Sequence, residues 1–115
     1  VEIIEDYRAI QFGKLNMIHG HEYQGGGGIH VAYNRLGKAM DNIMSAHSHV
    51  TQTNVKPNIN GSLYGSWTIG CLCLLNPAYN PKNTWTNGFA IVKREDNGDF
   101  EVHNRMIYNG KTIAI

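Results

Sequence analysis

Two pairs of histidines, each pair separated by one residue, stand at the ends of short apolar runs. His19 and His21 follow "LNMI", and His47 and His49 follow "NIMSA". Neutral imidazole is the commonest nitrogen ligand for zinc, manganese and iron in proteins. A single histidine of this kind is most often a surface or hydrogen-bonded residue, whereas two pairs that each close an expected strand favour a metal site.

The residues around the two pairs predict a strand–loop–helix–strand unit. "LNMIH" has the length and ending of a buried strand, and Gly25 to Gly28 exclude regular structure. A helix is expected from about Ile29 or Val31 to Asp41, with Val31, Leu36 and Met40 near one face, and "NIMSA" forms the second strand. This is the βαβ pattern of a layered α/β protein. Ligands of open α/β sheets bind at the carboxyl ends of strands, so we expect the four imidazoles to meet within a few ångströms of one centre.

The remainder of the chain has the turn signals of antiparallel hairpins. A short element ends near Ile10 or Phe12 and precedes a turn at Gly13. Asn60-Gly61 and "DNGD" (96–99) predict hairpins, and Asn109-Gly110 ends the last long strand. The segment 76–88 is expected to be a surface excursion. The aromatic residues have two interpretations, either core and surface positions or the sides of a substrate groove: Trp67, Tyr79 and Trp85.

The composition is that of one small globular domain. The chain has 115 residues, 42% of them hydrophobic and 17% charged, with a formal net charge of +1. A near-neutral charge disfavours a mainly electrostatic nucleic-acid or membrane binder. No apolar run approaches the roughly 20 residues of a membrane-spanning helix. We therefore expect a cytoplasmic protein with no membrane partner, and we expect His30 and His103 to be structural or exposed.

The two cysteines lie close together in "IGCLCLL". A Cys-x-Cys pair without a second pair offers at most half of a zinc site. We interpret Cys71 and Cys73 as two small buried hydrophobic residues of a strand in a reducing compartment, without a disulfide.

At this point the histidine motifs resemble those of a known family. "MIHGHE" followed by "SAHSH" resembles the last two metal-binding motifs of the calcineurin-like metallophosphoesterases, often written His-Gly-His and Gly-His-x-His. Ala46 takes the place of the family's glycine. The resemblance covers roughly residues 10 to 113, and "HGHEYQGGGG" also looks like the branch of the family found in phages and bacteria.

The resemblance implies a fold, a reaction and a set of site residues. Residues 1–115 would form a single partial domain, the C-terminal half of a four-layer sandwich, in which strand–loop–helix–strand is followed by antiparallel hairpins. The complete enzyme would use two divalent ions, Mn²⁺, Zn²⁺ or Fe, to hydrolyse a phosphomonoester or phosphodiester, with nucleic acid and nucleotides among the candidate substrates. The implied roles are metal binding by His19 and His47 at one ion and by His49 at the other, a catalytic, substrate-facing role for His21, and substrate binding by Gly25 and Gly26.

The glycine run has two interpretations. As the loop after the first strand it could bring backbone close to the metals or to a substrate phosphate, or it could be a flexible surface loop. The spaced glycine pattern of a nucleotide-binding loop is absent.

The family's other motifs do not occur in this chain. Asp-x-His, Gly-Asp-x-x-Asp and Asn-His are all missing, and no aspartate is placed to bridge two ions held by the histidines. Two dications a few ångströms apart would repel each other strongly without a carboxylate. We therefore expect the chain alone to be inactive and to bind at most one metal weakly. The aspartates are Asp6, Asp41, Asp96 and Asp99.

Three explanations of this half-set of motifs remain open. The chain is a fragment of a longer enzyme, which its start at Val1 favours; or it is one chain of a split enzyme whose partner supplies the N-terminal half; or it is a degenerate module. The competing function is accordingly a non-catalytic single-metal-binding or protein-interaction module.

Overall fold

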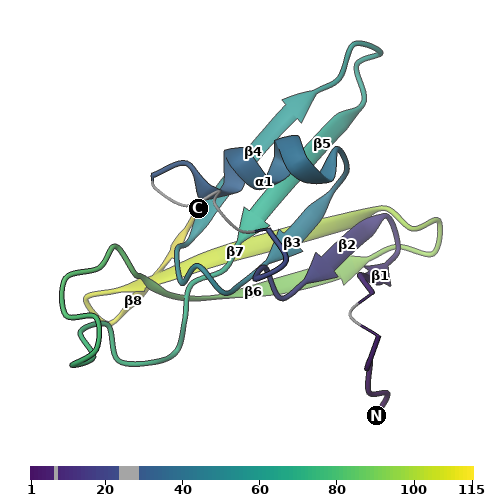
Figure 1. The fold of residues 1–115 in the computed structure, drawn as a ribbon. Helices are drawn as coiled ribbons and strands as arrows, with labels where there is room; N and C mark the ends of the chain where they lie inside the picture. The colour runs from purple at the N-terminus through teal and green to yellow at the C-terminus, as the bar shows by residue number, and fades with distance from the viewer. Residues whose placement is uncertain (7, 24–28) are drawn as a thin grey trace.

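The chain folds into two β-sheets and one helix within the part that the computed structural model describes, residues 1–6, 8–23 and 29–115 (Figure 1). The α+β class expected from the sequence is confirmed. The elements are β1 (Ile10–Phe12), β2 (Leu15–Ile18), α1 (Val31–Ala39), β3 (Ile43–Ser45), β4 (Gln52–Pro57), β5 (Leu63–Thr68), β6 (Asn87–Arg94), β7 (Phe100–Tyr108) and β8 (Lys111–Ala114).

The first sheet is mixed and has the strand order β1-β2-β3-β5-β4. Its three central strands, β2, β3 and β5, are parallel, and β1 and β4 pair antiparallel to them at the two edges. The helix α1 lies between β2 and β3 in the chain, so the predicted strand–loop–helix–strand unit is confirmed. The predicted hairpin of β4 and β5 is antiparallel, but it joins this sheet through a parallel pairing of β5 with β3 that the sequence did not predict.

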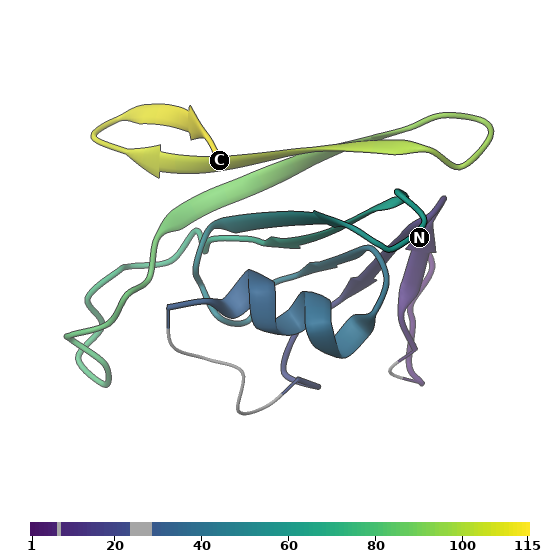
Figure 2. The same ribbon diagram turned by 90° about the horizontal axis from the view of Figure 1, so that it is seen from above.

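The second sheet is antiparallel, has the order β6-β7-β8 and covers the face of the first sheet opposite to α1 (Figure 2). The molecule therefore has three layers: helix, mixed sheet and antiparallel sheet. The predicted turns are present, since β6 and β7 are joined across residues 95–99 and β7 and β8 across Asn109-Gly110. Among the described residues, the nine-residue α1 is far too short to cross a membrane.

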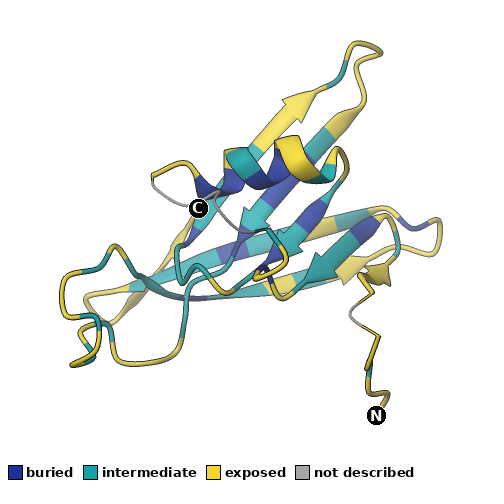
Figure 3. Ribbon diagram, viewed as in Figure 1, coloured by how far each residue is buried: buried dark blue, intermediate teal, exposed yellow. Residues whose placement is uncertain are grey.

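Buried apolar residues lie on both faces of the first sheet (Figure 3). Ile43 is almost fully buried on the face that carries α1, where Val31 and Leu36 of the helix are also buried, whereas Leu15 alternates with Asn16, the partner of Ile43, and is buried on the opposite face. Met40 was expected on the same helical face and is instead 84% exposed. The helix ends at Ala39, and Met40 takes a left-handed conformation with its N–H bonded to the carbonyl of Leu36, which turns its side chain out of the helical register.

The segment "IGCLCLL" is a loop, which corrects the expectation of buried strand cysteines. β5 ends at Thr68 because the chain then passes closely between other segments. A Cβ atom at Gly70 would lie 2.6 Å from the Thr86 carbonyl oxygen. Cys71 is half-buried and Cys73 is exposed, and both are free thiols.

A cavity of about 1050 Å³ lies between the two sheets at the amino ends of β2 and β3. Trp67 is half-buried on its wall and packs edge-on against Phe100, with ring centroids 5.6 Å apart. Trp67 was expected in the core, and it lies between the two sheets beside the cavity. Trp85 lies in the excursion between β5 and β6, as expected.

Asn104 connects the two sheets. It lies on β7, is 2% exposed, and its Nδ2 donates to the carbonyls of Gln52 at 2.9 Å and Thr68 at 3.0 Å. Both acceptors belong to the first sheet. One side chain of the second sheet therefore satisfies carbonyls of two strands of the first.

We predict that Asn104→Leu lowers the free energy of unfolding by about 1–3 kcal/mol, because it leaves two buried carbonyls without their donor. Urea denaturation measures the change. Glu101→Gln, an exposed substitution on the same strand, is the control and should leave the midpoint unchanged. Equal midpoints for the two variants would contradict the inter-sheet role.

Candidate metal centre

His19 and His47 follow the carboxyl ends of the neighbouring parallel strands β2 and β3. Ile18 is in register with Ser45, and the Ala46 N–H continues the pairing by donating to the His19 carbonyl at 2.8 Å. The side chains meet, with His19 Nε2 3.0 Å from His47 Nδ1. Two nitrogens bound to one ion at 2.0–2.1 Å would be about 2.9 Å apart in octahedral and about 3.3 Å apart in tetrahedral geometry. The observed separation is that of a hydrogen bond between the two rings, and it also lies within the range for two ligands of one ion.

Gly20 is required between the two histidines of the first pair. Its φ is +118°, and a Cβ there would lie 2.7 Å from the Ala46 carbonyl oxygen and 2.8 Å from Nη1 of Arg35. Any larger residue would clash with rigid neighbours in a conformation that L-residues avoid. The glycine of "HGH" thus allows β2 to end close against the loop after β3.

The loop after β3 holds both histidines of the second pair in left-handed backbone conformations. His47 has φ 63° and His49 has φ 57°. The Ser48 N–H donates to the Ala46 carbonyl at 2.7 Å, which closes a three-residue γ-turn around His47. Such conformations cost free energy and concentrate at functional sites. Here the tight turn accompanies the approach of His47 to His19.

His21 and Glu22 complete the rim of this group. The His21 ring centroid lies 5.2 Å from that of His19 and 6.2 Å from that of His47. Glu22 Oε1 is 3.0 Å from His21 Nδ1, and its Oε2 accepts the Gly20 N–H at 3.0 Å. Slight burial raises the pKa of Glu22, but this backbone bond and the adjacent histidines outweigh it and leave the pKa below its ordinary value. Glu22 therefore supplies a negative charge beside the imidazoles.

Arg35 connects the carboxyl ends of β2 and β3 from the helix side of the sheet. It projects from α1, is 4% exposed, and its Nη1 donates to Ser45 Oγ at 2.6 Å and to the Ala46 carbonyl at 2.8 Å. Nη2 reaches the Gly20 carbonyl at 3.5 Å. Burial lowers the pKa of Arg35, and the nearby Glu22 opposes this. The guanidinium thus holds the backbone on both sides of the histidine pair.

Fewer histidine rings lie together than the sequence predicted. We expected four imidazoles around one centre, but His49 turns away from the other three. Its Nδ1 is 3.9 Å from the Sγ of Cys73, and its ring packs edge-on against Trp85 with centroids 4.4 Å apart. Cys71 lies beside them, and the ligand atoms of His49 and the two cysteines are all within 4.8 Å of one another. The left-handed conformations at 47 and 49 accompany this divergence.

The remaining expected site residues lie elsewhere. The structure does not describe residues 24–28, so the substrate-binding prediction for Gly25 and Gly26 falls outside the described residues. Three of the four aspartates have partners away from the histidines: Asp6 pairs with Arg8, Asp41 accepts from Asn16, and Asp99 pairs with Lys14 at the opposite end of the strands. His30 is exposed, and His103 is half-buried and bonds to Glu101.

Sequence reasoning missed Arg35, Glu22 and the grouping of His49 with the cysteines. Arg35 lies four residues after Val31, on the apolar face of the helix, and a cation at such a position signals a buried role. Glu22 directly follows the His-Gly-His motif. The cysteine grouping had no comparable signal, because it depends on segments that meet only in the folded chain.

Comparisons with known proteins found no match: no family model, no curated protein and no solved structure is significantly similar to this chain.

We predict that Arg35→Met lowers the free energy of unfolding by about 1–3 kcal/mol, because buried acceptors at the two strand ends lose their donor. Arg35→Lys should recover little, since an ammonium cannot reproduce the planar fork of the guanidinium. Urea denaturation checks the stability, with Arg94→Met as an exposed control. A full rescue by lysine would show that charge alone matters at this position.

We also predict that His47 titrates below about 6.5, the usual pKa of histidine, in metal-free protein. Burial lowers the pKa of His47, and the positive charges of His19, Arg35, His21 and His49 lower it further. The unfolded chain then binds the extra proton more readily, so this residue destabilises the fold as the pH falls below about 6.5. Histidine NMR titration measures the pKa directly. His47→Asn, which tolerates positive φ, should weaken the pH dependence of unfolding; a His47 pKa above 6.5 would refute the prediction.

Proposed function

We propose that this chain supplies metal-binding histidines to a metal-dependent phosphoesterase centre, namely those of the family's last two metal-binding motifs. One observation carries the proposal: His19 Nε2 and His47 Nδ1 lie 3.0 Å apart at the carboxyl ends of two adjacent parallel strands. The motif resemblance assigns these two residues to the same ion, and the distance fits that assignment. The finer fold that the resemblance implies, the C-terminal half of a four-layer sandwich, is part of the same proposal.

The side chains around the pair suit a cation and an anionic substrate. A metal ligand must be a neutral imidazole, and the lowered pKa of His47 favours that form at neutral pH. Among the described residues, the charge of the Arg35 guanidinium is offset by the neighbouring Glu22 carboxylate, so a bound ion would provide the positive potential that attracts a phosphate group. His21 is oriented by Glu22 through Nδ1. When this ring is protonated, its Nε2 can donate a proton to a leaving oxygen.

A divalent ion here would supply Lewis-acid polarisation of the phosphoryl group. A bridging carboxylate for a second ion would come from outside residues 1–115. β1 offers a place for additional structure, because it is an edge strand whose three residues are all exposed, including Ile10 and Phe12. Further strands added at this edge would extend the sheet beside His19.

The second candidate function is a module that binds a single metal without catalysis. The placement of the aspartates favours it, since Asp41 and Asp99 lie at the amino ends of the strands, on the far side of the sheet from the histidines. Both candidate functions use the same metal site, but only the phosphoesterase would hydrolyse a phosphate ester.

Calorimetric titration of the 115-residue chain with Zn²⁺ or Mn²⁺ tests the shared site. We expect His19→Ala and His47→Ala each to weaken one binding event at least about tenfold, by analogy with the loss that follows disruption of the surroundings of a metal ligand. His103→Ala, a histidine on the second sheet, is the matched control and should bind as the unmodified chain does. Unchanged affinity in both ligand variants would remove the proposal.

Hydrolysis of bis(p-nitrophenyl) phosphate with Mn²⁺ separates the two candidates. The polypeptide of the complete reading frame is expected to turn over this ester, and His47→Ala to reduce the rate at least about 100-fold, because a Lewis acid contributes several kcal/mol to transition-state stabilisation. Metal binding without turnover would favour the non-catalytic module.

A further inference from the structure

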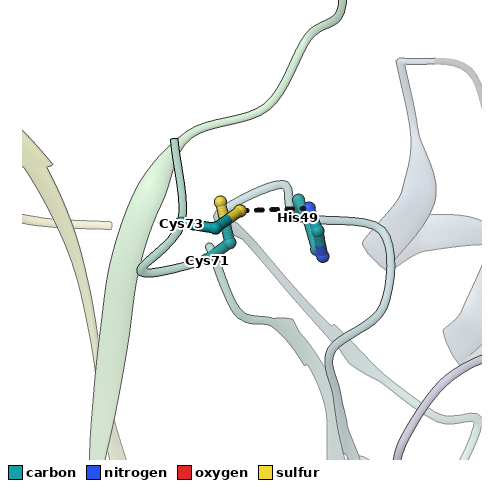
Figure 4. Close-up of side chains that lie close together, drawn as sticks. All are labelled: His49, Cys71 and Cys73. Carbon is teal, nitrogen blue, oxygen red and sulfur yellow. Dashed lines mark hydrogen bonds between the residues drawn. The ribbon is translucent and has the colours of Figure 1, made fainter. Parts of the chain in front are cut away.

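A second group of ligand side chains lies apart from the His19–His47 pair. His49 comes from the loop after β3, and Cys71 and Cys73 come from the loop after β5. Figure 4 shows the three side chains facing one another across the gap between the loops. Their ligand atoms are all within 4.8 Å of one another, and the distance from Cys73 Sγ to His49 Nδ1 is 3.9 Å.

The backbone around this group is tied by hydrogen bonds to the start of β6. Thr86 joins both loops, because its N–H donates to the His49 carbonyl at 2.7 Å and its carbonyl accepts the Cys71 N–H at 2.9 Å. The Asn87 side chain donates through Nδ2 to the carbonyls of Cys71 at 3.0 Å and Cys73 at 2.9 Å. One side-chain amide therefore binds the backbone carbonyls of both cysteines.

The distances are close to those of a metal centre. Zinc–sulfur bonds of about 2.3 Å and zinc–nitrogen bonds of about 2.0–2.1 Å place tetrahedral ligands about 3.6 Å (S to N) and about 3.8 Å (S to S) apart. The observed 3.9 Å between Cys73 and His49 is already near the first value. Separations up to 4.8 Å close by rotation of side chains that have room to move, since Cys73 is exposed.

We propose that His49, Cys71 and Cys73 bind one zinc ion, through one imidazole nitrogen and two thiolates. Two thiol protons leave as the two zinc–sulfur bonds form, so the ion's charge is neutralised and no oxidation or reduction takes place. Soft sulfur ligands select zinc over manganese or magnesium. The group has three members among the described residues, so the fourth position of a tetrahedral ion is open to water or another ligand.

This site has a chemistry different from that of the proposed phosphoesterase centre. Its three ligands are distinct from His19 and His47, and the inference departs from the motif resemblance, which would give His49 to a catalytic ion. Binding would tie the loop after β3 to the excursion between β5 and β6. Trp85 covers the His49 ring at 4.4 Å, so its fluorescence would respond to the ion.

Cobalt(II) titration of the reduced 115-residue chain tests the site, because tetrahedral Co²⁺ reports thiolate ligands through a charge-transfer band that nitrogen and oxygen ligands do not give. We expect one equivalent to produce this band and zinc to displace it. Cys71→Ser and Cys73→Ser should each weaken the binding that gives the band at least about tenfold, and His49→Ala should alter it.

The matched control is the double variant His19→Ala/His47→Ala, which should keep the thiolate band in full while losing the other binding event. The two proposals can thus fail separately. Absence of the band in the unmodified chain, or its persistence when both cysteines are serine, would overturn the zinc site.

A second measurement needs no variant. Zinc at one equivalent should slow alkylation of both thiols by iodoacetamide at least about tenfold, and a chelator should restore the original rate, as peptide mass spectrometry can follow. Thiols that react equally fast with and without zinc, under reducing conditions that exclude a Cys71–Cys73 disulfide, would contradict the proposal.

Discussion

A buried guanidinium holds the ends of two parallel strands together, and the histidine pair depends on it. Arg35 reaches from the helix to Ser45, Ala46 and Gly20, and among the described residues no carboxylate lies within ion-pair distance of it. A charge removed from water costs several kcal/mol unless hydrogen bonds replace its hydration, so these backbone and hydroxyl acceptors must stay where they are. Gly20 has no side chain because the guanidinium and the Ala46 carbonyl occupy that space. The position of His19 beside His47 follows from this packing.

The sequence predicts well those features that local periodicity and turn chemistry control. The βαβ unit, the hairpin turns and the ends of β2 and β3 all lie where apolar runs and glycine-containing turns indicated. Features that depend on contacts distant in sequence were not predictable in this way. The cysteines follow a run of strand-like residues, but the chain crossing at Gly70 and Thr86 ends the strand before them. Met40 fits the helical period, yet the helix stops one residue earlier.

The divergence of His47 and His49 places two side chains of one loop in different chemical surroundings. In an extended strand, residues two apart point to the same side, so a continued β3 would have presented both rings together. The γ-turn at His47 and the left-handed conformation of His49 replace that arrangement. One ring then meets another imidazole at the sheet edge, and the other meets sulfur beside Trp85. A His-x-His motif therefore does not by itself establish that both histidines share an ion.

The histidine pair and the group of His49 with the two cysteines differ in the negative charge that they offer to a bound metal ion. Two neutral imidazoles leave a bound dication with its full charge, and Glu22, turned toward His21 and the Gly20 N–H, offsets only part of it. A second ion at that edge would add repulsion that the described residues cannot neutralise. Two thiolates, in contrast, balance one Zn²⁺ completely, and their loop is already tied in place by Thr86 and Asn87. The sulfur group therefore offers the charge that one Zn²⁺ requires, whereas the proposed phosphoesterase centre requires carboxylates that the residues around the histidine pair do not supply.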